Sequence, residues 1–472
     1  MNDITAIFAF LKYCLGSKGD MSRVIAGMDW QELYSFASKQ ALLGLCFEGI
    51  ERLGEEYSEE LRLNPIGREL LMTWMGKAQQ IRRQNMKVNA VASKLFSMLR
   101  EDGLRCCILK GQGNALMYPN PYSRTPGDID VWINASRERI MEYASKKFEL
   151  GDDIRLQHLE TSLDGVPVEL HFFPCSMNNP IYHARLQNWF KRNADLQCSN
   201  VVGLPDGAGD IAIPTTAFNV IYQLTHLYHH FFDEGIGMRQ IIDYFLVVND
   251  FSKNVFLDTD LSNHPVNFSN HPVPLSKEGS TFSPSPSSSG SGDVTAPSRC
   301  SEPLRSKDGG PSKVSPDCAG WDRLDAIGAS KVSPDCAGWD RLDTTGDTSS
   351  VSCSSASTAL DVVQRELKYL GLWKFAGAVM YVLHEALGLS EEKMIVPMDE
   401  KRGKLLLAEI LNGGNFGRHF TKYGGFTHQS MGKKFFLKIW RNMHFVRYYP
   451  AEALCEPLFR TWHFFWRMKN KK

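Results

Sequence analysis

The stretch LKGQGNALMYPNPYSRTPGDIDVWI, residues 109–133, decides the fold of this 472-residue chain. It predicts the end of a short apolar strand over 105–109, a glycine turn, a short helix over 114–118 and a second strand over 128–133. Pro119, Pro121 and Pro126 keep the segment before the second strand in a loop, because proline lacks the backbone donor that helices and strands use. The order of strand, glycine turn, helix, proline-rich loop and strand is uncommon, and it determines where we expect the charged and phosphate-binding groups.

Two aspartates lie at the start of the second predicted strand. Asp128 and Asp130 are two positions apart, so both carboxylates project from the same face of a strand. Neighbouring carboxylates suit octahedral Mg²⁺ when phosphate oxygens supply further ligands. A D-x-D pair alone is more typical of a solvated strand end. The elements upstream of the pair make the metal site the favoured interpretation.

Groups suited to phosphate binding precede the aspartates. Gly111 follows a strand and opens a helix, where the backbone can approach a phosphate closely. Lys110 or Arg124 adds positive charge beside it. The predicted phosphate-binding residues are Lys110, Gly111, Gln112 and Arg124.

A third carboxylate follows from a predicted β-hairpin. Its strands cover 154–163 and 166–172, and Asp164-Gly165 is a two-residue turn signal. Apolar residues at 166, 168, 170 and 172 alternate with a polar face that carries Glu169 and His171. A carboxylate in an apolar strand is costly to bury unless it is paired or binds metal, so Glu169 is expected to be a metal ligand or a proton acceptor. An edge strand with Glu169 in water is the alternative, and Glu160 and Asp164 are weaker candidates.

Helical spacing of apolar residues covers the chain on both sides of this core. The helix before the first strand is expected to end near Gly103, which suits a left-handed cap, and Ser136 is expected to cap a helix that runs to Lys147. We predict a helical segment at 1–94, the core at 95–210, helices at 211–252, an insertion at 253–358 and a helical segment at 359–472. The predicted class is α+β, with a small mixed sheet between helical segments.

The predicted insertion has its own composition. It is rich in Ser, Pro, Gly and Asp, with SPSPSSSGSG at 283–292, and it carries SKVSPDCAGWDRLD at both 312–325 and 330–343. Two copies are too few for a solenoid, which needs at least about three repeats. The composition predicts a disordered insertion that contains a recent duplication.

The composition excludes some classes of protein. Lys+Arg and Asp+Glu both number 53, so no global charge attracts nucleic acid or an anionic membrane. The eleven cysteines include no CxxC pair, which favours a reducing cytoplasm. Asp3 and Lys12 interrupt the apolar N-terminus, and no run approaches the roughly 20 apolar residues that a transmembrane helix needs.

Three histidines share one face of a predicted helix. His226, His229 and His230 have the i, i+3 and i+4 spacing that can hold Zn²⁺, although a wet helix face is the commoner outcome. A second interpretation places some of these side chains in a cleft. The residues predicted to line that cleft are His171, His226, His230, Arg239 and Asp243.

These motifs carry a family resemblance. A glycine followed by D-x-D and a later acid resembles the superfamily of DNA polymerase β and the aminoglycoside nucleotidyltransferases. More narrowly, LKG, GDIDVW, VELHFF, HLYHHFF, GIGMRQIIDYFLV and ILNGGNFG resemble an uncharacterised nucleotidyltransferase family of bacteria, common in Bacteroidetes. The resemblance covers nearly all of the chain except the insertion. It implies that Gly111 belongs to the phosphate loop, that Asp128 and Asp130 are metal ligands and that Glu169 is the third acid. The chain departs from many superfamily members in lacking a serine after the glycine.

The resemblance also implies a reaction. An NTP would donate its nucleoside monophosphate group to a hydroxyl acceptor, with release of pyrophosphate and with two Mg²⁺ ions, or Mn²⁺ in their place. The acceptor would be a small molecule, an RNA end or a protein side chain. The alternative is a non-catalytic nucleotide-binding or scaffold protein that retains the fold. Three converging carboxylates argue against it, because a scaffold has no physical need for them.

Overall fold

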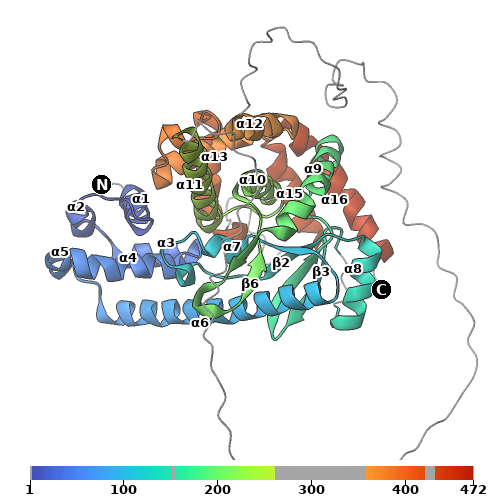
Figure 1. Ribbon diagram of the computed structural model, residues 1–472. Coiled ribbons are helices and arrows are strands. Elements are labelled where there is room, and N and C mark those ends of the chain that lie inside the picture. The colour runs from blue at the N-terminus through green and yellow to red at the C-terminus, as the bar shows by residue number, and fades with distance from the viewer. Residues whose placement is uncertain (1–2, 151–154, 261–357, 420–430, 471–472) are drawn as a thin grey trace, which may run out of the picture. The chain divides into compact units, whose positions relative to one another are not determined.

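The computed structural model describes residues 3–150, 155–260, 358–419 and 431–470 (Figure 1). These residues form a small mixed sheet with helices before and after it, so the predicted α+β class is confirmed. Most of the predicted insertion, including both repeat copies, lies outside the described residues. Its first residues are described, and they continue helix α11 (Met238–Asp260) beyond the expected boundary at Lys253.

The main sheet has four strands in the order β1-β2-β4-β3. The strands are β1 (Cys106–Leu109), β2 (Ile129–Ile133), β3 (His158–Leu163) and β4 (Val166–His171). β2 is antiparallel to β1 and parallel to β4, and β4 is antiparallel to β3. The predicted turn joins β3 to β4, with φ of 50° at Asp164 and 71° at Gly165, as a two-residue hairpin loop requires. A second, two-stranded sheet of β5 (Val201–Gly203) and β6 (Asp210–Ala212) was not predicted.

The alternation of side chains gives the main sheet two different faces. Ile129 and Val131 of β2 pack with Val168 of β4 in an apolar core that also includes residues of α6 (Arg68–Glu101) and α8 (Arg137–Lys147). On the opposite face, the Trp132 ring lies 6.0 Å from Phe190 of α9 (Pro180–Ser199) and 6.1 Å from Phe218 of α10 (Thr216–Asp233). Asp130 shares this second face, because it is two residues from Trp132.

The helices before the sheet end in a long helix that packs along it. They are α1 (Asp3–Cys14), α2 (Ser22–Ala26), α3 (Trp30–Lys39), α4 (Leu43–Glu56), α5 (Ser58–Leu63) and the 34-residue α6. Figure 1 shows α6 on the side of the sheet away from α9 and α10. Gly103 follows α6 with φ of 74°, so the predicted left-handed end of this helix is confirmed.

The short helix α7 (Gly111–Ala115) begins earlier than predicted. The Lys110 carbonyl accepts hydrogen bonds from the amides of Gly113 and Asn114, at 3.0 and 3.3 Å. The first helical turn therefore closes directly on the end of β1, instead of starting at Asn114. The predicted helix over 136–147 is confirmed as α8, where the Ser136 side chain accepts from the Arg139 amide.

Helices on both sides of the insertion share one apolar core. Those after it are α12 (Ala359–Tyr369), α13 (Trp373–Leu387), α14 (Glu400–Gly413), α15 (Met431–Met443) and α16 (Pro450–Asn470). Short 3₁₀ turns are η1 (Pro121–Ser123) and η2 (Pro205–Gly207) before the insertion and η3 (Glu391–Lys393) and η4 (Asn415–Gly417) after it. Phe231 of α10 lies 5.7 Å from Phe375 of α13 and 4.5 Å from Phe445, between ring centroids. None of the helices within the described ranges has the length and apolar character needed to cross a membrane.

Candidate active site

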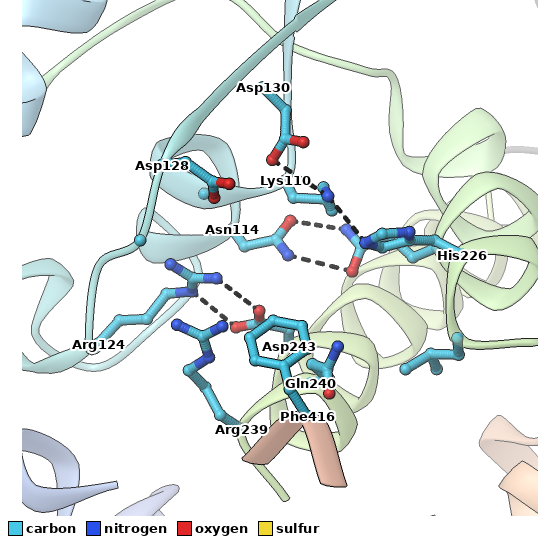
Figure 2. A pocket seen from close by; sticks show the side chains of 14 residues that line it. Lys110, Asn114, Arg124, Asp128, Asp130, His226, Arg239, Gln240, Asp243 and Phe416 are labelled. Atoms are coloured by element: carbon cyan, nitrogen blue, oxygen red, sulfur yellow. Dashed lines mark hydrogen bonds and ion pairs between the residues drawn. The ribbon is translucent and has the colours of Figure 1, made fainter. Parts of the chain in front are cut away.

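One pocket gathers most of the predicted site residues (Figure 2). Its lining comprises Lys110, Gly111, Asn114, Arg124, Gly127, Asp128, Asp130, Gln223, His226, Leu227, Arg239, Gln240, Asp243 and Phe416. The carboxylates of Asp128 and Asp130 point in from one side, and the guanidinium groups of Arg124 and Arg239 reach in from another. The predicted residues Gln112, Glu169, His171 and His230 are not part of this lining.

The two aspartates differ in environment. Asp130 is 5% exposed, and its carboxylate contacts Lys110 Nζ at 3.1 Å and His171 Nε2 at 3.0 Å. Burial opposes ionisation, but the Lys110 charge and the His171 hydrogen bond hold the pKa of Asp130 well below its usual range. The charge of Asp130, with burial, in turn raises the pKa of Asp128 to about 6. The pair therefore carries more negative charge than its surroundings readily accept.

Lys110 reaches the aspartates from a strained turn. Its φ of 51° and ψ of −134° belong to a conformation that glycine normally occupies. The side chain places Nζ 3.1 Å from Asp130 Oδ2 and 2.7 Å from His226 Nε2. Burial lowers the pKa of Lys110, but the charges of Asp130 and Asp128 outweigh this effect and raise it. Such strain persists where the surroundings fix the residue, and it is concentrated at functional sites.

His226 is the neutral partner of this lysine. Burial and the Lys110 charge hold the pKa of His226 well below its usual range. Its Nε2 therefore accepts a hydrogen bond from Lys110, which assigns the ring proton to Nδ1. The His226 and His230 rings are 4.3 Å apart between centroids, but His230 lies beyond the pocket wall. These histidines do not form a group with metal-ligand spacing within the described residues.

Glu169 is linked to the aspartates through His171. The parallel pairing of β2 and β4 sets Asp130 opposite Glu169. His171 Nε2 lies 3.0 Å from Asp130 Oδ1 and 3.1 Å from Glu169 Oε2. Burial lowers the pKa of His171, but these two hydrogen bonds raise it to about 9. An imidazolium thus holds carboxylates of two neighbouring strands together.

The arginines form the cationic side of the pocket. Arg124 Nε and Nη2 donate to the two carboxylate oxygens of Asp243, each at 2.8 Å, and Tyr118 Oη donates to the same carboxylate at 2.8 Å. Arg239 donates to the carbonyl of Thr125 at 2.9 Å. Arg124 Nη1 and Arg239 Nε are buried without a hydrogen-bond partner in the described part of the chain. Because buried donors are normally paired, these two suit an anionic ligand.

Sequence reasoning did not place Phe416 in the pocket, and the predicted residue Gln112 lies outside the pocket lining. Phe416 lies in η4, just after the end of α14, with φ of 55°, and a side chain at the adjacent Gly417 would collide with the carbonyl of Glu234. Its ring lies 5.6 Å from the Arg239 guanidinium carbon. The motif GGNFG was visible in the sequence, but nothing local indicates that its aromatic ring lines this pocket. Gln112 instead is buried and donates to the side chain of Asn89.

A family model identifies the chain as nucleotidyltransferase-like. The model of a family described as "Uncharacterised nucleotidyltransferase" matches residues 26–262, half of the chain, and the chain belongs to this family. Among solved structures, the chain is similar to an antigenic nucleotidyltransferase-like protein from Paracoccidioides brasiliensis, at 17% identity and a TM-score of 0.24. That similarity covers 37% of this chain and 85% of the other. No curated protein matches the chain.

Proposed function

We propose that this protein transfers a nucleoside monophosphate group from an NTP to a hydroxyl acceptor and releases pyrophosphate. The observation that carries this proposal is that Asp128 and Asp130 line the same pocket as Lys110, Arg124 and Arg239. Acidic oxygen donors for a divalent cation and fixed positive charges for a triphosphate meet there. The membership of the family supports a nucleotide as one substrate.

The donor chemistry fits Mg²⁺, or Mn²⁺ in its place. Asp128 and Asp130 offer hard carboxylate oxygens, and the raised pKa of Asp128 reflects a negative charge in need of a counter-cation. These two residues would hold the ions, with Glu169 as the third acid. Two bound ions supply charge stabilisation at the α-phosphate and at the departing pyrophosphate.

The residues of the chain have separable tasks in this reaction. The acceptor oxygen forms a bond to the α-phosphorus, and the bond from that phosphorus to the oxygen that bridges to the β-phosphate breaks. The unpartnered donors of Arg124 and Arg239 are suited to the phosphates that leave as pyrophosphate. Glu169 either accepts the hydroxyl proton or anchors metal, and the two roles differ in their kinetic consequences.

Labelled nucleotides test this proposal. Each of the common NTPs, labelled in the α- or the γ-phosphate, is incubated with the protein, Mg²⁺ and a cell extract. We expect label from the α-phosphate in an acceptor and label from the γ-phosphate in pyrophosphate. Asp128→Asn should abolish both signals, while Asp164→Asn should retain them, because Asp164 lies in an exposed turn. Binding of NTP without transfer would favour a non-catalytic protein, and γ-label in the acceptor would indicate a phosphotransferase.

A further inference from the structure

A second set of possible ligands lies on strands β3 and β4. The register places His158 directly opposite His171, two residues from Glu169 on the same face of the sheet. His158 Nδ1 lies 3.2 Å from Glu169 Oε2, and His171 Nε2 lies 3.1 Å from the same oxygen. Across the described ranges, these three residues form the group whose ligand atoms all lie within 4.8 Å of one another. Asp128 and Asp130 are not members of it.

His158 gives an independent indication of a ligand. It is 8% exposed, and neither of its ring nitrogens has a hydrogen-bond partner among the described residues. Buried polar atoms are normally hydrogen-bonded, so a buried ring whose nitrogens have only the contacts of Nδ1 with Glu169 at 3.2 Å and of Nε2 with Glu160 at 3.8 Å needs an explanation. The ring is aimed at Glu169, since Nδ1 is the nitrogen that faces the carboxylate.

We propose that His158, Glu169 and His171 bind one transition-metal ion of the Zn²⁺ type, at a site that shares Glu169 with the proposed Mg²⁺ site but does not include Asp128 or Asp130. Two imidazole nitrogens and one carboxylate oxygen are ligands that zinc accepts, whereas Mg²⁺ prefers oxygen alone. Zinc ligands at about 2.0–2.1 Å in tetrahedral geometry are about 3.3 Å apart. The observed separations of 3.1 and 3.2 Å at Glu169 Oε2 are close to this spacing.

A fourth position at this site is open to water, and the neighbouring carboxylate of Glu160 is engaged elsewhere. The Glu169 side chain is 21% exposed, so a water molecule can reach a fourth position from solvent. Glu160 is also near His158, at 3.8 Å, but its carboxylate is engaged by Arg155 at 2.7 Å. Glu160 is therefore a neighbour of the site and not a member of the ligand set.

Zinc at this site would affect the transfer reaction, and this consequence rests on the proposed function. His171 Nε2 is the atom that donates to Asp130, and Glu169 is the third acid. An ion that binds both atoms displaces the Nε2 proton of His171 to solvent, which removes the hydrogen bond to Asp130, and it also engages Glu169. We therefore expect zinc to inhibit Mg²⁺-dependent transfer.

Direct metal binding tests the site without any assay of transfer. Full-length protein stripped of metal is titrated with Zn²⁺ against a chromophoric chelator, and with Co²⁺ followed by its visible absorption. We expect one ion per chain and the intense bands of four-coordinate Co²⁺. His158→Gln and Glu169→Gln should each weaken Zn²⁺ binding by about 100-fold or more, since loss of even an outer partner costs about 10–100-fold. Glu160→Gln and Asp128→Asn are the matched controls and should keep the affinity.

Circular dichroism identifies any variant that fails to fold. If either His158→Gln or Glu169→Gln does not fold, the Zn²⁺ affinity of the other variant tests the proposal. Absence of Zn²⁺ binding at micromolar concentration would overturn the proposal. So would equal binding by wild type, His158→Gln and Glu169→Gln. Zinc that binds without slowing transfer contradicts the inhibition and leaves the site standing. Absence of transfer in any metal contradicts the proposed function alone.

Discussion

Replacement of Asp243 by asparagine removes the negative charge at the centre of a buried polar cluster. The carboxylate accepts two hydrogen bonds from Arg124 and one from Tyr118, all at 2.8 Å. The Arg124 and Asp243 side chains are 5% and 7% exposed. Asparagine keeps the shape but turns an amide N–H₂ towards donors, and it leaves the Arg124 cation without a counter-charge. Arg239 adds a second guanidinium to the same region.

The size of the effect follows from this burial. Removal of one partner of a buried ion pair costs about 3–5 kcal/mol, whereas exposed pairs contribute about 1 kcal/mol or less. Asp195→Asn is the matched control. Asp195 pairs with Arg105 at 2.6 Å, a shorter contact, but these side chains are 75% and 52% exposed. Distance alone would rank Asp195 as the more important residue, and burial predicts the reverse.

Urea unfolding at pH 7 measures both variants on the same scale. We expect Asp243→Asn to lower the free energy of unfolding by about 3–5 kcal/mol and Asp195→Asn by about 1 kcal/mol or less. A second substitution, Arg124→Met, should recover part of the Asp243→Asn loss, because it removes the uncompensated charge. Equal losses for the two aspartate variants would refute the assignment of the cluster as a stabilising element that positions the arginines.

Three further outcomes are expected. Asp128→Asn and Asp130→Asn should each reduce turnover to less than about a tenth, and only Asp130→Asn should also lower the melting temperature; full turnover of either variant would contradict the ligand assignment. Glu169→Gln should lower the single-turnover rate by about a hundredfold or more and change nucleotide affinity by less than about tenfold; an equal loss of affinity would make Glu169 mainly a metal anchor. Burial raises the pKa of Glu452 to about 7, so folding favours the protonated acid. The stability that protonated Glu452 contributes is complete below the usual glutamate pKa and is lost as the pH rises through 7. Glu452→Gln should therefore gain stability relative to wild type between pH 5 and pH 8, by up to roughly 3 kcal/mol, in unfolding curves across that range.

The elements that sequence reasoning placed correctly are those specified by local chemistry. The alternation in β4 predicted a buried face, and Val166, Val168 and Leu170 are 3%, 1% and 0% exposed. The Asp164-Gly165 turn fixes the hairpin because its two residues accept positive φ. Asp128 and Asp130 line one pocket, although β2 begins at Ile129 and only Asp130 lies within the strand.

The elements that it missed depend on distant parts of the chain. β5 and β6 have three residues each, too few to show an alternating pattern. Phe416 reaches the pocket from beyond the insertion, and its position depends on backbone contact between η4 and the residues after α10. The spacing of apolar residues within a short segment carries no information about which helices pack against each other. The sequence therefore could not show that Phe416 lines the pocket.

The different expectations for Asp128 and Asp130 follow from how the strained turn at Lys110 is held. Asp130 is an acceptor for Lys110 and contacts His171, so it stabilises two buried cations. Without the charge of Asp130, the Lys110 ammonium remains next to neutral His226. The Lys110 backbone, with φ of 51°, then loses an interaction that offsets its strain. The charge of Asp128 also attracts Lys110, but its repulsion by Asp130 has the larger effect on its pKa, so asparagine at 128 relieves net repulsion. Loss of activity in Asp128→Asn with an unchanged or higher melting temperature would therefore report on the chemistry of the site. In Asp130→Asn, loss of activity is expected together with a lower melting temperature, because the turn that positions Lys110 is destabilised.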